Sequence, residues 1–102
     1  MTTADLAPLL DQLAADAHAD ATRRGIYPQG VLDSIEDVRD EAMEAYTAAS
    51  CNRMPELPDE LADVILCCLT LMHDMGISPG QAILAKATHN TTRGPRGKEA
   101  KS

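Results

Sequence analysis

Two pairs of acidic residues stand three positions apart in this 102-residue sequence: Glu41 with Glu44, and Glu60 with Asp63. Residues at that spacing lie on one side of a helix, so each pair can face one direction. If the two segments fold back as an antiparallel hairpin, the four carboxylates converge. They cannot all stay ionised there without a cation, and oxygen ligands suit Mg²⁺ or Mn²⁺. The spacing therefore predicts a metal site that could hold the phosphates of a substrate.

The same residues also allow a plainer interpretation. Glu41 and Glu44 lie in an acidic stretch, which a solvated helix face explains, and an acidic residue such as Glu60 in a first turn favours the helix dipole. Asp63 fits this interpretation less well, because Ala62 precedes it and an apolar run follows it. A carboxylate among apolar side chains needs a partner or a metal. On spacing alone, both interpretations stay open.

The elements that would position these carboxylates are helices. The chain has no Trp, no Phe and only two Tyr, whereas sheets favour aromatic and β-branched residues. Apolar positions at helical spacing, broken by Gly and Pro, predict four helices over about residues 5–24, 32–49, 58–75 and 78–90. The length supports one core, so we expect a single all-α domain over residues 1–90 and a basic, flexible tail over 91–102.

The third helix is apolar on every side from Val64 to Leu69, so one layer of neighbours cannot cover it. We expect it to be central, buried within the subunit and against a partner, which predicts an oligomer. The second helix shows one apolar stripe that includes Ile35, Ala45 and Tyr46. The expected caps are Asp33 or Ser34 for the second helix and Ser78 for the fourth.

The net charge of −7 is unevenly distributed. Residues 1–85 carry four Lys or Arg against fifteen Asp or Glu, whereas residues 86–102 carry five against one. An acidic body argues against nucleic acid and anionic membranes as partners. The longest apolar run is far shorter than the ~20 residues that span a bilayer. The sequence does not open with a basic leader followed by an apolar stretch, so we expect no signal peptide. We therefore expect a soluble cytoplasmic protein.

The cysteine pattern favours reduced thiols. Cys51, Cys67 and Cys68 are odd in number, and two of them are adjacent in an apolar run, which makes a poor disulfide framework. A zinc site built from them and His73 would lack the paired-ligand spacing of structural zinc sites.

Further motifs follow the acidic pairs in a fixed order. Residues 40–45 (DEAMEA) and 59–65 (DELADVI) contain ExxE and ExxD spacings, and residues 77–83 (ISPGQAI) turn into a short helix. A K-x-x-x-N-x-x-R pattern at Lys86, Asn90 and Arg93 precedes a Gly-Lys pair that ends at Lys98. Over about residues 18 to 98 this set resembles the MazG-like nucleotide pyrophosphohydrolases. The chain departs from that family at His89, where Tyr is usual, and before Lys98, where a His is missing.

The resemblance implies a four-helix MazG-like bundle that forms a homodimer or homotetramer. It also implies Mg²⁺-dependent hydrolysis of a nucleoside triphosphate to the monophosphate and pyrophosphate. Glu41 would orient or deprotonate the attacking water. The metal ligands that it implies are Glu41, Glu44, Glu60 and Asp63. The substrate contacts that it implies are Lys86, Asn90, Arg93 and Lys98, and the candidates for the base pocket are His18 and Tyr27.

Two other functions fit parts of the pattern. A phosphoribosyl-ATP pyrophosphohydrolase shares the acidic helix motifs, but the series from Lys86 to Lys98 favours the MazG-like branch. A non-catalytic helical oligomer that binds a protein partner would carry solvated acidic faces, and Mg²⁺ would not change its stability. The sequence leaves the preferred base and sugar open.

Overall fold

Helices make up the fold of residues 2–92, the part of the chain that the computed structural model describes. The four α-helices are α1 (Leu6–Arg23), α2 (Val31–Ser50), α3 (Leu57–Asp74) and α4 (Pro79–Asn90), with short 3₁₀ turns η1 (Thr3–Asp5) and η2 (Met54–Glu56). The predicted all-α fold is confirmed, and the helix bounds differ from the predicted ones by no more than one residue.

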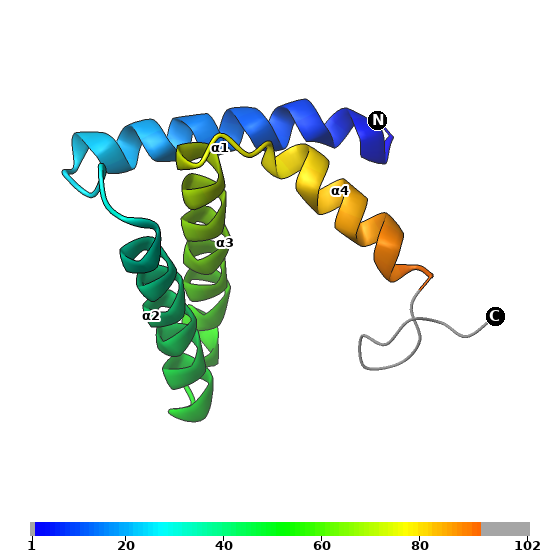
Figure 1. Cartoon of the computed structure of the whole chain (residues 1–102). Coiled ribbons are helices and arrows are strands. Elements are labelled where there is room, and N and C mark those ends of the chain that lie inside the picture. Colours follow the sequence, from blue (N-terminus) through cyan, green and yellow to red (C-terminus); the bar gives the residue numbers. More distant parts are fainter. Residues whose placement is uncertain (1, 93–102) are drawn as a thin grey trace.

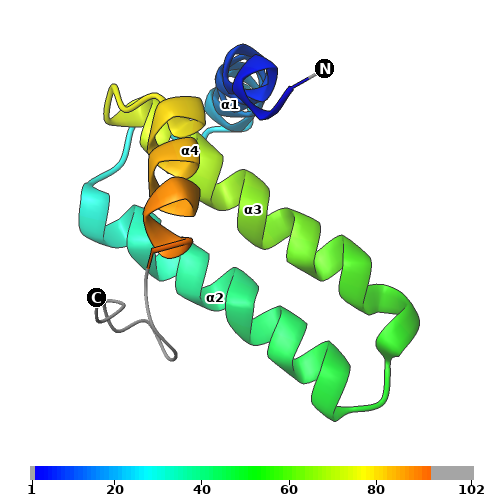
Figure 2. The same ribbon diagram turned by 90° about the vertical axis from the view of Figure 1, so that its right-hand side faces the viewer.

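The helices α2 and α3 form an antiparallel hairpin that η2 closes at one end (Figures 1 and 2). Helix α1 crosses the open end of this hairpin and packs mainly on α3. Helix α4 begins at the same junction, leans on α1 and then runs away from the hairpin (Figure 1). Helix α3 packs on both α1 and α2 and also touches α4, which makes it the central helix.

Small residues let the helices approach closely. The buried positions include Ala14 and Ala21 on α1, Ala45 and Ala48 on α2, and Leu69 on α3. The predicted apolar stripe on α2 is split between two faces. Ala45 is buried, whereas the side chain of Tyr46 is 70% exposed and faces away from the core.

The N-terminal cap of α4 is the residue predicted from the sequence, whereas the cap of α2 is a different residue. Ser78 caps α4 as predicted, and its hydroxyl accepts a hydrogen bond from the backbone N–H of Gln81. The cap of α2 is Gly30 instead of Asp33 or Ser34. Ser34 is buried one turn inside the helix, where its hydroxyl accepts a hydrogen bond from the amide of Gln29.

A carboxylate of α1 fixes the start of α4. Asp11 accepts hydrogen bonds from the hydroxyl of Ser78 and from the backbone N–H of Gly80, each at 2.9 Å. The backbones are close here, because a Cβ atom on Gly80 would lie 2.4 Å from the carbonyl oxygen of Ala7. The junction of α1 and α4 is therefore tightly packed and tied by charged hydrogen bonds.

Among residues 2–92, no single helix is long and apolar enough to cross a membrane. Residues 54–74 and 79–90 meet the length and composition only when taken together, as a pair bent by 115°.

The junction of α1 and α4 predicts an unequal effect of two Asp→Ala substitutions. Asp11→Ala should lower the free energy of unfolding by about 1.5–3 kcal/mol, because it removes hydrogen bonds to a charged acceptor. Asp40→Ala is the matched control: Asp40 is exposed and its nearest cation is 4.0 Å away, so its loss should cost less than about 0.5 kcal/mol. Urea unfolding of both variants measures the difference, and equal losses would contradict the role of Asp11.

Candidate metal and substrate site

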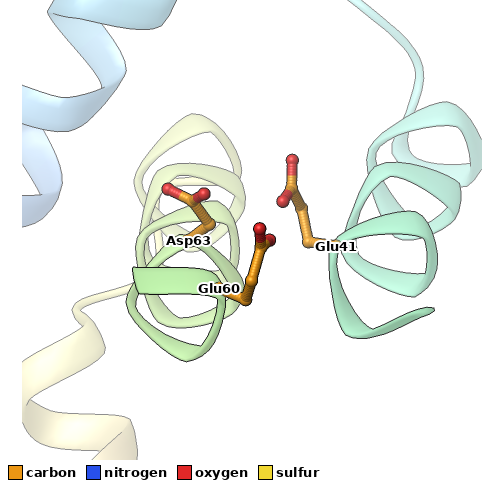
Figure 3. A group of neighbouring side chains, drawn as sticks. All are labelled: Glu41, Glu60 and Asp63. Atoms are coloured by element: carbon orange, nitrogen blue, oxygen red, sulfur yellow. The ribbon is translucent and has the colours of Figure 1, made fainter. Parts of the chain in front are cut away.

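The hairpin brings three of the four predicted carboxylates together. Glu41 of α2 faces Glu60 and Asp63 of α3 across the gap between the two helices (Figure 3). One carboxylate oxygen from each residue lies within 4.8 Å of the other two. The antiparallel return predicted from the spacing is therefore what places these oxygens within reach of a single ion.

Glu44 lies at the edge of this group. Its side chain is exposed and supplies no oxygen to the group of three, although it is one turn from Glu41 on the same helix. Glu44 nevertheless acts on Glu41, because its nearby carboxylate disfavours the ionised form and so raises the pKa of Glu41. The structure therefore brings three carboxylates into the group and places the fourth beside it.

The carboxylates of the group are electrostatically strained. Burial is the largest of the effects that raise the pKa of Glu41 from 4.5 to about 7, and the nearby Glu44, Asp63 and Glu60 contribute to the same rise. The pKa of Glu60 is also raised, first by burial and then by the charges of Glu44 and Asp63. Packed carboxylates behave in this way because each ionised group disfavours the ionisation of the next.

Two oxygen atoms of the group lack any hydrogen-bond partner. Glu41 Oε2 and Glu60 Oε2 are inaccessible to solvent, and no described residue donates a hydrogen bond to either atom. Buried polar atoms are normally paired, since leaving them unpaired is costly. A divalent cation would pair both oxygens and offset the negative charge, so the residues present fit a metal ion that prefers oxygen ligands.

A cavity of about 510 Å³ adjoins the group and lies between α1, α2 and α3. Glu41 and Asp63 form part of its wall, and Tyr27, Leu66 and Thr70 add a mostly apolar surface. Its volume is within the range of about 300–1,000 Å³ that small-molecule sites occupy. The cavity is therefore large enough for a nucleotide-sized molecule beside the carboxylates.

The two base-pocket candidates differ in position. Tyr27 lines the cavity and is only 7% exposed. His18 does not line it, but its ring lies against Tyr27 with centroids 4.8 Å apart, and its Nε2 is 2.9 Å from a carboxylate oxygen of Asp74. His18 therefore supports Tyr27 and ties α1 to the end of α3.

The other predicted substrate residues do not join the group in this chain. Lys86 and Asn90 belong to α4, which leaves the hairpin, and neither residue lines the cavity (Figure 1). Arg93 and Lys98 lie outside the described residues.

Sequence reasoning missed the α1 wall of the cavity. Asp16, Asp20 and Arg24 all line it, and their spacing of four residues is the signal that places them on one helix face. Cys67 lines it as well, one turn after Asp63. Burial raises the pKa of the Cys67 thiol to about 11, so the neutral thiol contributes an apolar surface, in keeping with the prediction of reduced cysteines.

One comparison with known proteins decides the family. The family model described as phosphoribosyl-ATP pyrophosphohydrolase matches residues 10–89, which include all three converging carboxylates and most of the cavity wall. The chain belongs to this family. No curated protein and no solved structure gives a significant match. Membership supports a pyrophosphohydrolase with a helical fold, a hydrolase acting on phosphoric anhydrides, and it favours the second enzyme considered above over the generic nucleoside triphosphate hydrolase.

The raised pKa of Glu41 predicts how pH affects the metal-free protein. A carboxyl whose folded pKa of about 7 exceeds its unfolded value of 4.5 stabilises the fold below pH 4.5, and that stabilisation is lost as pH rises to about 7. In EDTA, the Tm of the wild type should therefore fall more between pH 5 and pH 8 than the Tm of Glu41→Gln, whose side chain does not titrate.

Millimolar Mg²⁺ should raise the Tm of the wild type more at pH 8 than at pH 5, because the carboxylates are ionised at the higher pH. Differential scanning fluorimetry at constant ionic strength measures both effects. Identical pH profiles of the wild type and Glu41→Gln would show that the Glu41 carboxyl is not held in the strained environment described.

Proposed function

We propose that this protein is a divalent-metal-dependent pyrophosphohydrolase that converts phosphoribosyl-ATP and water to phosphoribosyl-AMP and pyrophosphate. The observation that carries the proposal is the group of three carboxylates, with two unpaired buried oxygens, at the wall of a nucleotide-sized cavity. The family match supports this substrate more than a generic nucleoside triphosphate.

In the proposed site, Glu41, Glu60 and Asp63 hold Mg²⁺ or Mn²⁺, and Glu44 adds negative charge at the edge. The ion supplies positive charge that offsets the charge developing on the phosphates. Without it, the carboxylates would repel the triphosphate, so this proposal makes substrate binding depend on the metal.

Glu41 has a second proposed role, which is to orient the attacking water and accept its proton. A bound cation would favour the ionised form of Glu41, which is the form that can accept this proton. The nucleoside would occupy the apolar part of the cavity. The phenol ring of Tyr27 would pack against the base there, and His18 would hold that ring in place.

We also propose that the protein acts as a homo-oligomer. Large apolar side chains face outward on the hairpin: Leu32 is 81% exposed on α2, and Ile65 is 59% exposed on α3. A second copy of the chain would cover these side chains, as the apolar surface of the third helix predicts. Because α4 leaves its own hairpin, a neighbouring copy is also the route by which Lys86 and Asn90 would reach a carboxylate group.

Removal of a metal ligand is the first test of the activity. Glu60→Gln and Asp63→Asn should each lower pyrophosphate release from phosphoribosyl-ATP by at least about 100-fold, because each removes a ligand of the ion that would offset the charge on the reacting phosphates. Glu56→Gln is the control, since Glu56 is an exposed acid of η2 outside the group. Circular dichroism checks that the variants remain folded.

The assay compares phosphoribosyl-ATP with a panel of ribo- and deoxyribonucleoside triphosphates, with Mg²⁺ and with EDTA. Pyrophosphate release from phosphoribosyl-ATP that stops in EDTA supports the proposal. Pyrophosphate release from the nucleoside triphosphates alone would show that phosphoribosyl-ATP is not the substrate, while the protein would still be a pyrophosphohydrolase. Folded wild-type protein that releases no pyrophosphate from any of these nucleotides would favour the non-catalytic oligomer.

The outward apolar side chains predict the effect of one charge on assembly. Leu32→Asp should shift the protein to a smaller species in sedimentation velocity at micromolar concentration, since a carboxylate in an apolar interface is costly. Glu36→Ala, an exposed position on the same helix, is the control and should leave the sedimentation unchanged. A wild-type protein that sediments as a monomer would refute the oligomer.

A further inference from the structure

Arg24 supplies positive charge to an otherwise acidic cavity. The acidic residues that line the cavity are Asp16, Asp20, Glu41 and Asp63, and Arg24 is the one cation among the described lining residues. It lies at the end of α1, where the helix ends at Arg23. The cavity thus has a carboxylate group on the hairpin side and a guanidinium at the end of α1.

The geometry around Arg24 leaves part of its guanidinium available. Its Nε lies 3.0 Å from Asp20 Oδ2, and a terminal nitrogen of Arg23 contacts the other oxygen of the same carboxylate. The Arg23 guanidinium holds the pKa of Asp20 below its usual value, so this carboxylate remains ionised. Two guanidiniums sharing one carboxylate leave a net charge of about +1, and within residues 2–92 no ion pair occupies the terminal nitrogens of Arg24.

A purely structural role explains this arrangement only in part. Exposed pairs at i,i+3 and i,i+4 spacing contribute about 0.2–0.5 kcal/mol each, and such pairs do not require either side chain to line a cavity. The side chain of Arg24 is 56% exposed, so a ligand in the cavity can reach it. Asp20 fixes the guanidinium through Nε, which leaves the planar terminal edge for a bidentate contact with a phosphate.

The distribution of charge in the cavity determines which charged groups a ligand must carry. The metal-binding carboxylates would take a polyphosphate through the ion, and the α1 wall spans the twelve residues from Leu13 to Arg24, a rise of roughly 16 Å along a helix. A ligand that fills this space and reaches Arg24 needs a second anionic group, separate from its triphosphate. Phosphoribosyl-ATP has such a group, the phosphomonoester on the ribose that is attached to its adenine ring.

We propose that Arg24 is the binding residue for the phosphomonoester of the phosphoribosyl group. Asp20 positions its guanidinium, and the charge of Arg23 offsets the charge of Asp20. This inference rests on the proposed function, and it adds the residue by which the site distinguishes phosphoribosyl-ATP from an ordinary nucleoside triphosphate.

The test compares two ligands that differ only in the phosphoribosyl group. Isothermal titration with Mg²⁺ gives the affinities of phosphoribosyl-AMP and AMP for the wild type, Arg24→Gln and Arg24→Lys. Arg53→Gln is the matched control, because Arg53 also pairs through its Nε with a carboxylate one turn away but lies outside the cavity. The wild type and Arg53→Gln should bind phosphoribosyl-AMP at least about tenfold more tightly than AMP, since charged hydrogen bonds give effects of that size.

Arg24→Gln should abolish the preference for phosphoribosyl-AMP over AMP, while its affinity for AMP stays within about twofold of the wild type. Arg24→Lys should retain part of this preference, because lysine keeps the positive charge as a point charge. In turnover, Arg24→Gln should raise KM for phosphoribosyl-ATP and leave kcat nearly unchanged. Equal weakening of both ligands, or no preference in the wild type, would overturn the subsite.

Pyrophosphate release by the wild type separates this inference from the proposed function. If the wild type hydrolyses phosphoribosyl-ATP and Arg24→Gln does so with an unchanged KM, the subsite is wrong and the enzyme assignment stands. If the wild type hydrolyses only nucleoside triphosphates, the subsite and the substrate are both wrong. If the wild type releases no pyrophosphate from any nucleotide, the proposed function itself fails.

Discussion

Repulsion between carboxylates held in the α2–α3 hairpin is the interaction on which the rest of the site depends. Glu41, Glu60 and Asp63 bring oxygen atoms within 4.8 Å of one another, and two buried oxygens have no hydrogen-bond partner among the described residues. The packing of alanines on α2 against α3 imposes this proximity, because small side chains allow the helices to approach. These crowded carboxylates therefore lower the stability of the fold, but they keep a binding site for positive charge. Functional sites commonly reduce stability in this way.

Helix α1 turns this charged group into a cavity. By crossing the open end of the hairpin it adds a third wall, and the loop that follows it contributes Tyr27 to the lining. Its position is fixed by contacts at two points: the pair of His18 with Asp74 at the end of α3, and the hydrogen bonds of Asp11 to the start of α4. The same helix thus carries structural contacts and lining residues on different faces.

The sequence predicted the fold and three of the carboxylates because both follow from local periodicity. The i,i+3 spacings and the loop length were enough to expect Glu60 and Asp63 opposite Glu41. Spacing could not separate Glu41 from Glu44, since both are compatible with the same helix and their difference depends on the rotation of α2 against α3. The same rotation decides which apolar residues of α2 are covered, and the predicted stripe combined Ala45 with Tyr46, which the structure separates.

Other features could not be predicted because they arise only from tertiary contact. The α1 wall of the cavity depends on a crossing between helices that are distant in sequence, and no local pattern encodes that crossing. The cap of α2 is an example. Ser34 is a residue type that often caps helices, but its hydroxyl is buried and accepts a hydrogen bond from Gln29, so Gly30 takes the cap position. The acidic motifs are common to two related enzyme classes, so the motifs alone could not choose between them.

The exposed apolar surface and the position of α4 both favour the proposed homo-oligomer. A chain of this size has few residues with which to build a core, and here large side chains such as Leu32, Ile65 and Tyr46 remain outside it. Monomeric proteins seldom leave so many large apolar side chains exposed on one hairpin. Because Lys86 and Asn90 are carried away from the carboxylates on the same chain, assembly would cover the apolar surface and could also complete the site. Stability and substrate binding would then depend on the same contact between copies.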